Sequence, residues 1–249
     1  MLNPCPLPGL LITATDTGVG KTLVTGAIAR WFLGDGARVA VCKPCATGCV
    51  RRREGLVSED AEFLAHCAQT RHPLDLICPQ RYAEPLAPAI AAQRSGRPID
   101  WEAIDRSFRL MSADNDVMLV EGIGGAMVPM DDKHIFLDVI AWLRLAVVVV
   151  ALPKLGTINH TLLTLSALRS RGIRIAGVVI NRYPTDTPST AEETNPRAIE
   201  KWGKTQVLCV VPEAHWQKDL VQVGLVPPGV ASAIGTVDWA DLGKPARRR

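Results

Sequence analysis

Short apolar stretches alternate with longer stretches of helical periodicity along most of the chain. The apolar stretches are rich in β-branched residues and are short enough to be single buried strands. They cover Leu10–Thr15, Arg38–Lys43, Val117–Glu121, Ala146–Leu152, Ile173–Asn181 and Gln206–Val211. Apolar residues recur at helical spacing in Gly20–Leu33, Ser58–Gln69, Ile99–Ser112, Ile135–Leu143, Asn159–Arg171 and Asn195–Trp202. This alternation predicts an α/β fold in which a parallel sheet carries helices on both faces.

Three further segments complete the predicted layout of residues 1–249 as a single domain. Ala83–Arg94 is expected to be helical, with Pro85 and Pro88 near its start, where proline is tolerated. Tyr183–Thr194 is rich in Pro, Thr and Ser, which predicts a mobile surface loop. After about Pro227 we expect a weakly structured, flexible tail.

Residues 10–22 read LLITATDTGVGKT, an apolar strand that ends in a glycine loop ahead of a helix. Gly18, Val19 and Gly20 form a loop whose backbone N–H groups can turn inward on an anion, and Lys21 can reach the terminal phosphates of a nucleotide. The Thr22 hydroxyl is suited to hold a magnesium ion. Since the positive end of the next helix points at the same place, the segment predicts a phosphate-binding loop, or P-loop.

The loop departs from the usual pattern G-x-x-x-x-G-K-[ST] at one position. The pattern has Gly at position 15, where this chain has Thr15, preceded by Ala14. An ordinary glycine turn before a helix is the alternative interpretation. The strand before the loop and the helix after it favour phosphate binding.

Small and polar residues stand at the ends of several predicted strands. Lys43 ends the second strand, Glu121 ends the third, and Asn181 ends the fifth. Ligands of open parallel sheets bind at the carboxyl ends of the strands, so we expect these side chains to meet the P-loop at one rim. A lone Lys or Glu at such a position is more typical of an ordinary surface charge.

Composition excludes several classes of function. Of the 249 residues, 47% are hydrophobic, and the net charge of +3 is too weak to predict binding to nucleic acid. The basic clusters Arg51–Arg53 and Arg247–Arg249 are typical of solvated loops and frayed termini. With no apolar run long enough for a membrane span and no secretory signal, we expect a cytoplasmic protein that does not bind membranes. The seven cysteines are accordingly expected to be reduced.

Five segments resemble, in order, the ATP-dependent dethiobiotin synthetases, over roughly Leu11 to Pro212. They are Thr15–Thr22 (TDTGVGKT), Cys42–Gly48 (CKPCATG), Val120–Gly125 (VEGIGG), Leu155–His160 (LGTINH) and Glu193–Pro196 (ETNP). The resemblance implies a P-loop NTPase-like fold and a ligase of biotin synthesis. One amino group of 7,8-diaminopelargonate captures CO2 as a carbamate, and the carbamate takes the γ-phosphoryl group of ATP. The second amine then displaces phosphate and closes the ureido ring, which leaves dethiobiotin, ADP and phosphate.

The resemblance also implies which residues carry this chemistry. Thr22, Asp60 and Glu121 would be ligands of Mg²⁺, an ion that prefers oxygen. Lys21 and Lys43 would flank the carbamate and the γ-phosphate as catalytic residues, because phosphoryl transfer needs cations rather than a protein nucleophile.

The remaining roles concern the two substrates. The resemblance implies that Thr47 donates a hydrogen bond to the carbamate and that Asn181 contacts adenine. It also implies that the carboxylate of the diamine lies at a helix start on the partner subunit of a homodimer, where backbone N–H groups are exposed. That helix start comprises Gly156, Thr157, Ile158 and Asn159.

Some positions depart from this family or allow another interpretation. Gly18 stands where many relatives have Glu, so a side-chain contact to the amines of the substrate is absent and a lower substrate affinity is expected. Without the resemblance, Asp60 would be read as a carboxylate that stabilises a helix start. His160 is interpreted as a structural side chain rather than a catalytic base.

Cys42, Cys45 and Cys49 have the spacing C-x2-C-x3-C, which invites a metal or iron–sulfur interpretation. Alternation along a strand points Cys42 away from Lys43, and no further C-x-x-C pair supplies additional ligands. Buried or loop thiols are therefore the favoured interpretation.

Two other classes of function compete with the synthetase. The partitioning and septum-site ATPases share this type of fold, but they carry a second lysine early in the P-loop, and Ala14–Thr17 contains none. They also use a C-terminal amphipathic helix at the membrane, and the C-terminus here shows none. A corrinoid amide synthase would normally bring a glutamine-hydrolysing domain, for which no length remains.

Overall fold

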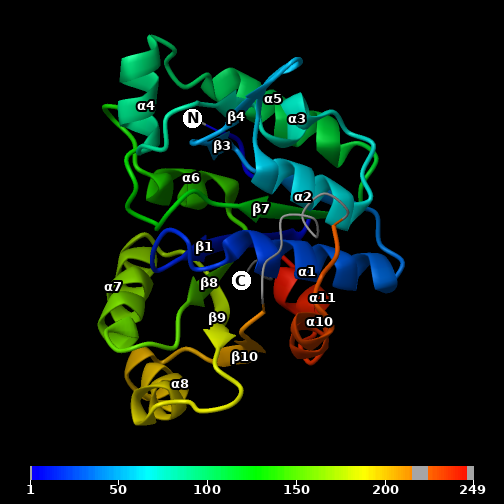
Figure 1. Cartoon of the computed structure of the whole chain (residues 1–249). Helices are drawn as coiled ribbons and strands as arrows, with labels where there is room; N and C mark the ends of the chain where they lie inside the picture. The colour runs from blue at the N-terminus through cyan, green and yellow to red at the C-terminus, as the bar shows by residue number, and fades with distance from the viewer. Residues whose placement is uncertain (1, 215–223, 246–249) are drawn as a thin grey trace.

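The structure, a computed structural model, describes residues 2–214 and 224–245. Six parallel strands form the central sheet in the order β10-β9-β8-β1-β7-β2 (Figure 1). They are β1 (Gly9–Ala14), β2 (Val39–Cys42), β7 (Val117–Glu121), β8 (Ala146–Ala151), β9 (Ile175–Tyr183) and β10 (Val207–Pro212). The predicted α/β fold with a parallel sheet is therefore confirmed.

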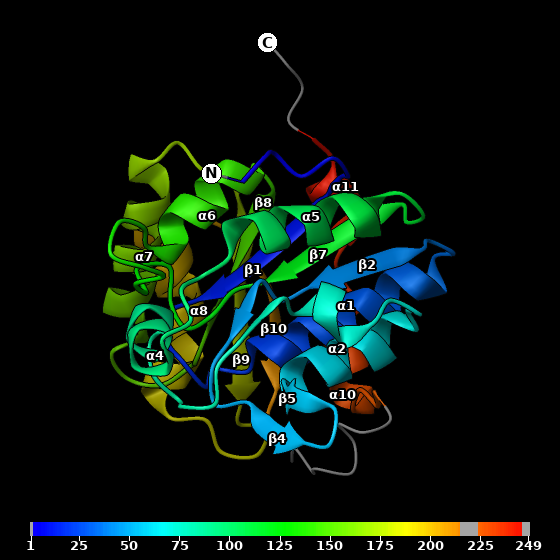
Figure 2. The ribbon, with the colours of Figure 1, turned by 90° about the horizontal axis from the view of Figure 1, so that it is seen from above.

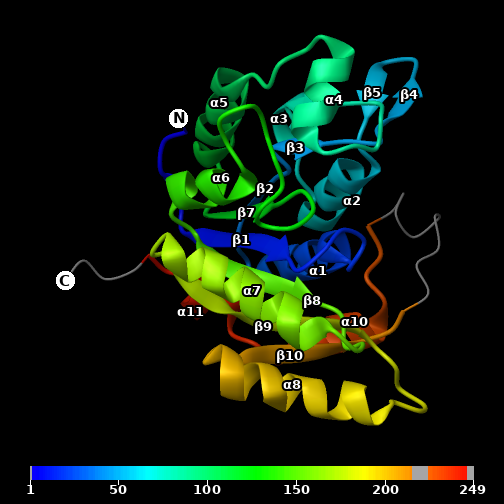
Figure 3. The same cartoon turned by 90° about the vertical axis from the view of Figure 1, so that its left-hand side faces the viewer.

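Helices cover both faces and both edges of this sheet, and α1 and α7 lie on opposite sides of the strands in Figure 1. Figure 3 shows α8 beside β10 at one edge, whereas α5 and α2 lie toward β2 at the other. The helices are α1 (Lys21–Gly34), α2 (Glu59–Ala68), α3 (Leu74–Ile77), α4 (Pro88–Ser95), α5 (Trp101–Ser112), α6 (Phe136–Leu143), α7 (Thr157–Ser170), α8 (Thr190–Gly203), α10 (Pro228–Ile234) and α11 (Trp239–Gly243). None of the helices in the described part of the chain is long and apolar enough to cross a membrane.

The central strands are unbroken runs of apolar residues, without alternation between apolar and polar positions. β8 reads AVVVVA, and all six residues are fully buried. A strand that is apolar on both faces is stable only where helices cover both faces of the sheet. The same helices hold the carboxyl ends of the strands in fixed positions.

Two small sheets lie beyond β2 and were not predicted. β3 (Cys45–Ala46) pairs in parallel with β6 (Gln80–Arg81), and β4 (Val50–Arg52) forms an antiparallel hairpin with β5 (Gly55–Val57). Figure 2 shows this hairpin beside α2 at the surface of the molecule. Strands of two or three residues have no detectable periodicity, so the sequence pattern could not reveal them.

Two of the predicted helix boundaries are wrong. The helix expected from Ala83 begins only at Pro88, because Ala87 precedes a proline and adopts an extended conformation. Helix α8 begins at Thr190, so the loop predicted over 183–194 is wrong for its last five residues. A capping box explains the early start: the hydroxyl of Ser189 accepts from the N–H of Glu192, whose carboxylate accepts from the N–H of Ser189.

The prediction of a weakly structured chain after about Pro227 is wrong for residues 228–243. Helix α10 packs against β10 and α1, and α11 packs against β1. Trp239 is fully buried, and its indole N–H donates to the carbonyl of Ile234 at 2.9 Å. These helices are too short to show a strong periodicity and are held by tertiary contacts. The basic cluster Arg247–Arg249 lies outside the described residues.

Candidate active site

The P-loop connects β1 to α1 in the predicted way. Gly18 and Gly20 have φ angles of 73° and 91°, in the left-handed region that favours glycine. Gly20 caps α1 without a side-chain hydrogen bond, so no side chain occupies the N-terminal N–H groups of this helix. The loop therefore offers free donors to an anion.

The departure at Ala14 and Thr15 does not disturb the loop. Among the described non-glycine residues, a positive φ occurs only at Gln69, Arg144, Arg182 and Lys204. Ala14 is the last residue of β1 and is fully buried. Since the backbone needs no left-handed conformation at either position, both side chains are accommodated.

A hydrogen bond from Asn181 connects the carboxyl-terminal part of β9 to the P-loop. Its side-chain amide donates to the carbonyl of Val19 at 2.7 Å, across 162 positions of sequence. The Oδ1 atom of this buried side chain has no hydrogen-bond partner in the described part of the protein. A buried amide oxygen of this kind is suited to accept a hydrogen bond from a ligand.

Most of the predicted site residues line one cleft of about 550 Å³ at the carboxyl ends of the strands. The predicted residues that line it are Gly18, Gly20, Lys21, Thr22, Lys43, Thr47, Asp60, Glu121 and Asn181. Val19 is buried below the loop and takes part through its carbonyl. The tertiary structure thus brings together residues that are far apart in the sequence.

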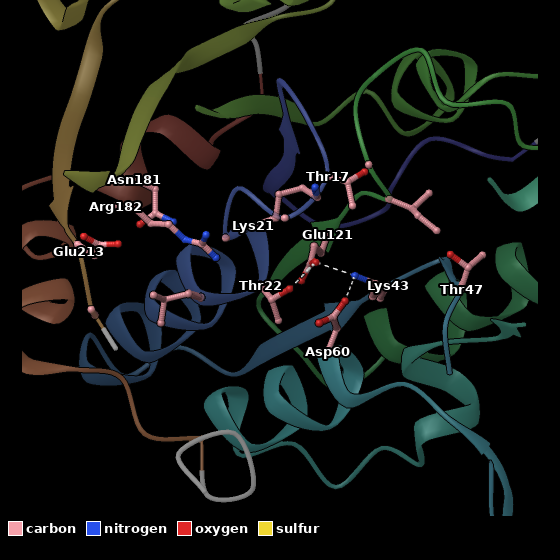
Figure 4. A pocket seen from close by; sticks show the side chains of 16 residues that line it. Thr17, Lys21, Thr22, Lys43, Thr47, Asp60, Glu121, Asn181, Arg182 and Glu213 are labelled. Carbon is pink, nitrogen blue, oxygen red and sulfur yellow. Dashed lines mark hydrogen bonds and ion pairs between the residues drawn. The ribbon is translucent and has the colours of Figure 1, made fainter. Parts of the chain in front are cut away.

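Lys43 is the centre of a charged cluster in the middle of this cleft (Figure 4). Its ammonium group lies 2.5 Å from Asp60 Oδ2 and 2.7 Å from Glu121 Oε1. The hydroxyl of Thr22 donates to the same Glu121 oxygen at 2.9 Å. The three predicted metal ligands are therefore adjacent, with a lysine bonded to both carboxylates.

Burial and charge act against each other in this cluster. Burial raises the pKa of Glu121 above its ordinary value, although the nearby ammonium group opposes the shift. Burial acts in the same direction on Asp60, but there the charge of Lys43 outweighs it and the pKa is lowered. Burial also disfavours the charge of Lys43, yet the two carboxylates raise its pKa above the ordinary lysine value. The cluster therefore favours the ammonium form of Lys43.

Lys21 is a second buried cation, and among the described residues it has no carboxylate partner of its own. Its ammonium group donates to the carbonyl of Asp16 at 3.2 Å, which folds the side chain back over the loop. Burial lowers the pKa of Lys21 to about 8, and the charge of Glu121 only partly compensates. Because the positive charge of Lys21 is only partly compensated, its ammonium group is suited to bind an anion.

Thr47 reaches the cleft because the chain before and after it is hydrogen-bonded to residues 80–84. Cys45 and Ala46 pair with β6, and the N–H groups of Gly48 and Cys49 donate to the carbonyls of Glu84 and Tyr82. Figure 4 shows Thr47 beyond Lys43, at the end of the cleft away from Asn181. The cleft thus has one end near Asn181 and another near Thr47.

The helix start predicted to bind a carboxylate lies elsewhere. Gly156 caps α7 without a side-chain bond, but none of the residues 156–159 lines the cleft of this chain. Asn195, a buried residue of α8, donates to the carbonyl of Pro153 at 2.5 Å and so holds the turn that leads into α7. Asn195 belongs to the ETNP segment, whose role was not predicted from the sequence.

Several lining residues were not assigned a role from the sequence. Arg182 follows Asn181 with a φ of 59°, and Glu213 follows β10. Figure 4 shows both beside Asn181 at one end of the cleft. The rule that ligands bind at strand ends would have included Glu213 if it had been applied to the last strand. The other lining residues without an assigned role are Thr17, Leu23, Ile123, Gly124 and Ala214.

The cysteines take no part in this cleft. All seven are free thiols, and burial raises the pKa of Cys42, Cys45 and Cys49. Among the residues that the structure describes, no group of three or more His, Cys, Asp or Glu side chains is arranged to hold a metal ion. The metal interpretation of the C-x2-C-x3-C spacing therefore has no structural support.

Comparison with known proteins assigns the chain to a family. An AAA domain matches residues 8–219. The ATP-dependent dethiobiotin synthetase BioD of Thermodesulfovibrio yellowstonii is 38% identical over 211 residues, which cover 82% of this chain and 88% of that protein. The protein of the same name from Bacillus subtilis strain 168 is 33% identical over 227 residues, which cover 88% and 96%. The chain belongs to the ATP-dependent dethiobiotin synthetase family. The resemblance inferred from five short segments of sequence is thereby confirmed.

Solved structures related by fold belong to another class of ATPase. The cell division protein MinD of Aquifex aeolicus has a TM-score of 0.56 and 18% identity, with 97% of this chain and all of that chain covered. A ParA family ATPase from Chlorobium tepidum TLS has a TM-score of 0.57 and 13% identity, with 92% and 97% covered. At such identity the likeness shows that this chain shares the fold of these ATPases, and nothing of their function.

Proposed function

We propose that the protein is an ATP-dependent dethiobiotin synthetase, which joins CO2 to 7,8-diaminopelargonate and closes the ureido ring. One observation carries the proposal: in a chain of this family, one cleft contains the P-loop lysine, a second buried lysine and two carboxylates. Phosphoryl transfer to a carbamate concentrates negative charge and needs this set of groups.

The nucleotide is bound along the cleft from Asn181 to the P-loop. The N–H groups of the loop and of the start of α1 hold the phosphates, and Lys21 adds a positive charge that no carboxylate of the described residues pairs with. The unpartnered Oδ1 of Asn181 accepts a hydrogen bond from the exocyclic amino group of adenine. Arg182 and Glu213, which line the same end, enclose the base.

The residues present fit a magnesium ion. Glu121 Oε2 is a buried carboxylate oxygen with no hydrogen-bond partner in the described residues, and Asp60 and Thr22 supply further oxygens. Magnesium usually takes one or two carboxylates and completes its shell with phosphate oxygens and water. When bound, the ion neutralises charge on the transferring phosphoryl group.

Each chemical step then builds negative charge beside these side chains. One amine of the substrate adds to CO2, loses a proton and becomes a carbamate. Lys43 and the hydroxyl of Thr47 hold its oxygens. The carbamate oxygen attacks the γ-phosphorus of ATP and releases ADP, and the second amine displaces phosphate from the carbamoyl phosphate to close the ring. Lys21 and Lys43 stabilise the charge that develops on the transferring group.

A homodimer completes the proposed site. The start of α7, Gly156–Asn159, would bind the carboxylate of a diamine held in the partner subunit's cleft. Two exposed apolar side chains support an interface here: Leu155, in the turn before α7, is 88% exposed, and Leu163, within α7, is 62% exposed. Sedimentation at micromolar protein tests the dimer, since a fully active species with the 26.9 kDa mass of one chain would contradict it. The cytoplasmic location remains a prediction.

The decisive experiment measures ADP release with the diamine, bicarbonate and ATP each omitted in turn. A synthetase needs all three, whereas a nucleotide-driven switch of the partitioning type hydrolyses ATP without the diamine. ADP release at the same rate without the diamine would refute the proposal.

A pair of variants connects the activity to the cleft. Lys43→Met should lower turnover by about a hundredfold or more while ATP still binds, because Lys43 acts mainly on charge that develops in the transition state. Lys133→Met changes an exposed lysine outside the cleft and should leave turnover unchanged.

A further inference from the structure

Lys43 occupies the position where the predicted metal ligands converge. Its ammonium group bonds both carboxylates at 2.5 and 2.7 Å, and the Thr22 hydroxyl bonds the Glu121 oxygen that Lys43 also contacts. Lys43 is 4% exposed and Glu121 is 1% exposed, so water replaces little of the bond between these two, whereas the side chain of Asp60 is 46% exposed. Figure 4 shows Asp60 and Glu121 directed at the same ammonium group, with Thr22 directed at Glu121.

Two cations compete for these oxygens. A buried carboxylate such as that of Glu121 is costly unless a cation compensates it, and Lys43 supplies that compensation. A magnesium ion binds carboxylate oxygens at about 2.0–2.1 Å. With Lys43 in place, such an ion would lie close to an ammonium group in a poorly solvated setting, where like charges repel strongly.

We infer that Lys43 is a stand-in cation: it neutralises Asp60 and Glu121 before the nucleotide binds, and magnesium arriving with the nucleotide displaces it. The displaced ammonium group then becomes available to the carbamate on the Thr47 side. This inference rests on the proposed function for the identity of the ligands, but it concerns an exchange of cations that precedes any chemistry.

The exchange has a consequence for the order of binding. Free magnesium has to compete with Lys43 without help from phosphate oxygens, so the metal alone binds weakly. Magnesium that carries a nucleotide gains the P-loop contacts as well and wins the competition. Lys43 therefore leaves the carboxylates only when the nucleotide is in place, which keeps its charge from the carbamate until ATP is present.

The test measures binding of Mn²⁺, a spectroscopic substitute for Mg²⁺, to nucleotide-free protein by electron paramagnetic resonance. Lys43→Met should bind Mn²⁺ at least about tenfold more tightly than the wild type, equivalent to about 1.4 kcal/mol. Lys43→Arg keeps a cation between the carboxylates and should bind as weakly as the wild type. Lys21→Met removes a nearby buried charge that bonds neither carboxylate, and it should change the affinity much less than Lys43→Met does.

Each result supports the exchange or overturns it. Unchanged Mn²⁺ affinity in Lys43→Met overturns it, and so does an equal gain in Lys21→Met, which would reflect the general field of the cleft. If Lys43→Met unfolds without metal, Mn²⁺ should restore its thermal transition. If Mn²⁺ does not restore it, Lys43→Gln replaces it in the same titration, and no gain in affinity there overturns the inference. None of these measurements depends on the diamine, so the inference and the proposed function can fail separately.

Discussion

Gly20 and Gly18 form a matched pair of P-loop positions at which a single added methyl group should have very different effects. Both have a left-handed backbone, with φ angles of 91° and 73°. A Cβ at Gly18 would have no heavy atom of the described residues within 4 Å, whereas a Cβ at Gly20 would lie 2.1 Å from the side-chain nitrogen of Asn181. Gly20→Ala therefore combines backbone strain with a collision, and Gly18→Ala isolates the strain.

The magnitude follows from these contacts. A left-handed alanine costs about 1 kcal/mol at either position. At Gly20 the collision also displaces the amide of Asn181 from the carbonyl of Val19, a 2.7 Å hydrogen bond worth about 1 kcal/mol, and disturbs a closely packed region for about 1 kcal/mol more. We expect Gly20→Ala to lower the free energy of unfolding by about 3 kcal/mol, against about 1 kcal/mol for Gly18→Ala.

Urea denaturation of both variants provides the assay, with the transition midpoint and the slope compared with those of the wild type. Asn181→Ala supplies the control, because it removes the group that the new methyl would meet. On that background Gly20→Ala should cost about 1 kcal/mol, which gives a coupling of about 2 kcal/mol between the two positions. Equal costs for the two glycine variants, or a Gly20→Ala cost that Asn181→Ala does not reduce, would refute this reasoning.

Three further predictions concern contacts away from the P-loop. Asn195→Ala should lower the free energy of unfolding by about 1–3 kcal/mol, since it leaves a buried carbonyl before α7 unpaired. Asn195→Asp should lower this free energy further because it places an acceptor beside that carbonyl, and urea denaturation of both variants checks the order. Trp239→Ala should cost about 3–5 kcal/mol in the same assay because the side chain is fully buried, whereas Trp202→Ala, at 59% exposure, should stay within about 0.5 kcal/mol. Arg38 lowers the pKa of Asp116 to about 2, so the contribution of this pair to stability is present above about pH 4 and is lost as the pH falls toward 2. In Arg38→Met, a carboxyl NMR titration should show the pKa of Asp116 rising toward 3.8.

The fold and the position of much of the cleft could be predicted from the sequence, because both depend on local sequence patterns. A strand that is buried on both faces is an unbroken apolar run, so the six parallel strands could be recognised one by one. The P-loop is contiguous from β1 to α1, and its glycines are required by the backbone of the loop itself. Lys43, Glu121 and Asn181 could be placed at one rim because parallel strands end at the same edge of their sheet.

Only the tertiary structure decided how these residues contact one another. The bond from Lys43 to Glu121 spans 78 positions and that from Asn181 to Val19 spans 162, and no periodicity carries such information. Asp60 is compatible with an ordinary helix start, and it becomes part of the cleft only because α2 packs beside β2. The helices of residues 228–243 were missed for the same reason, since burial of Trp239 against distant elements, rather than local propensity, holds them in place.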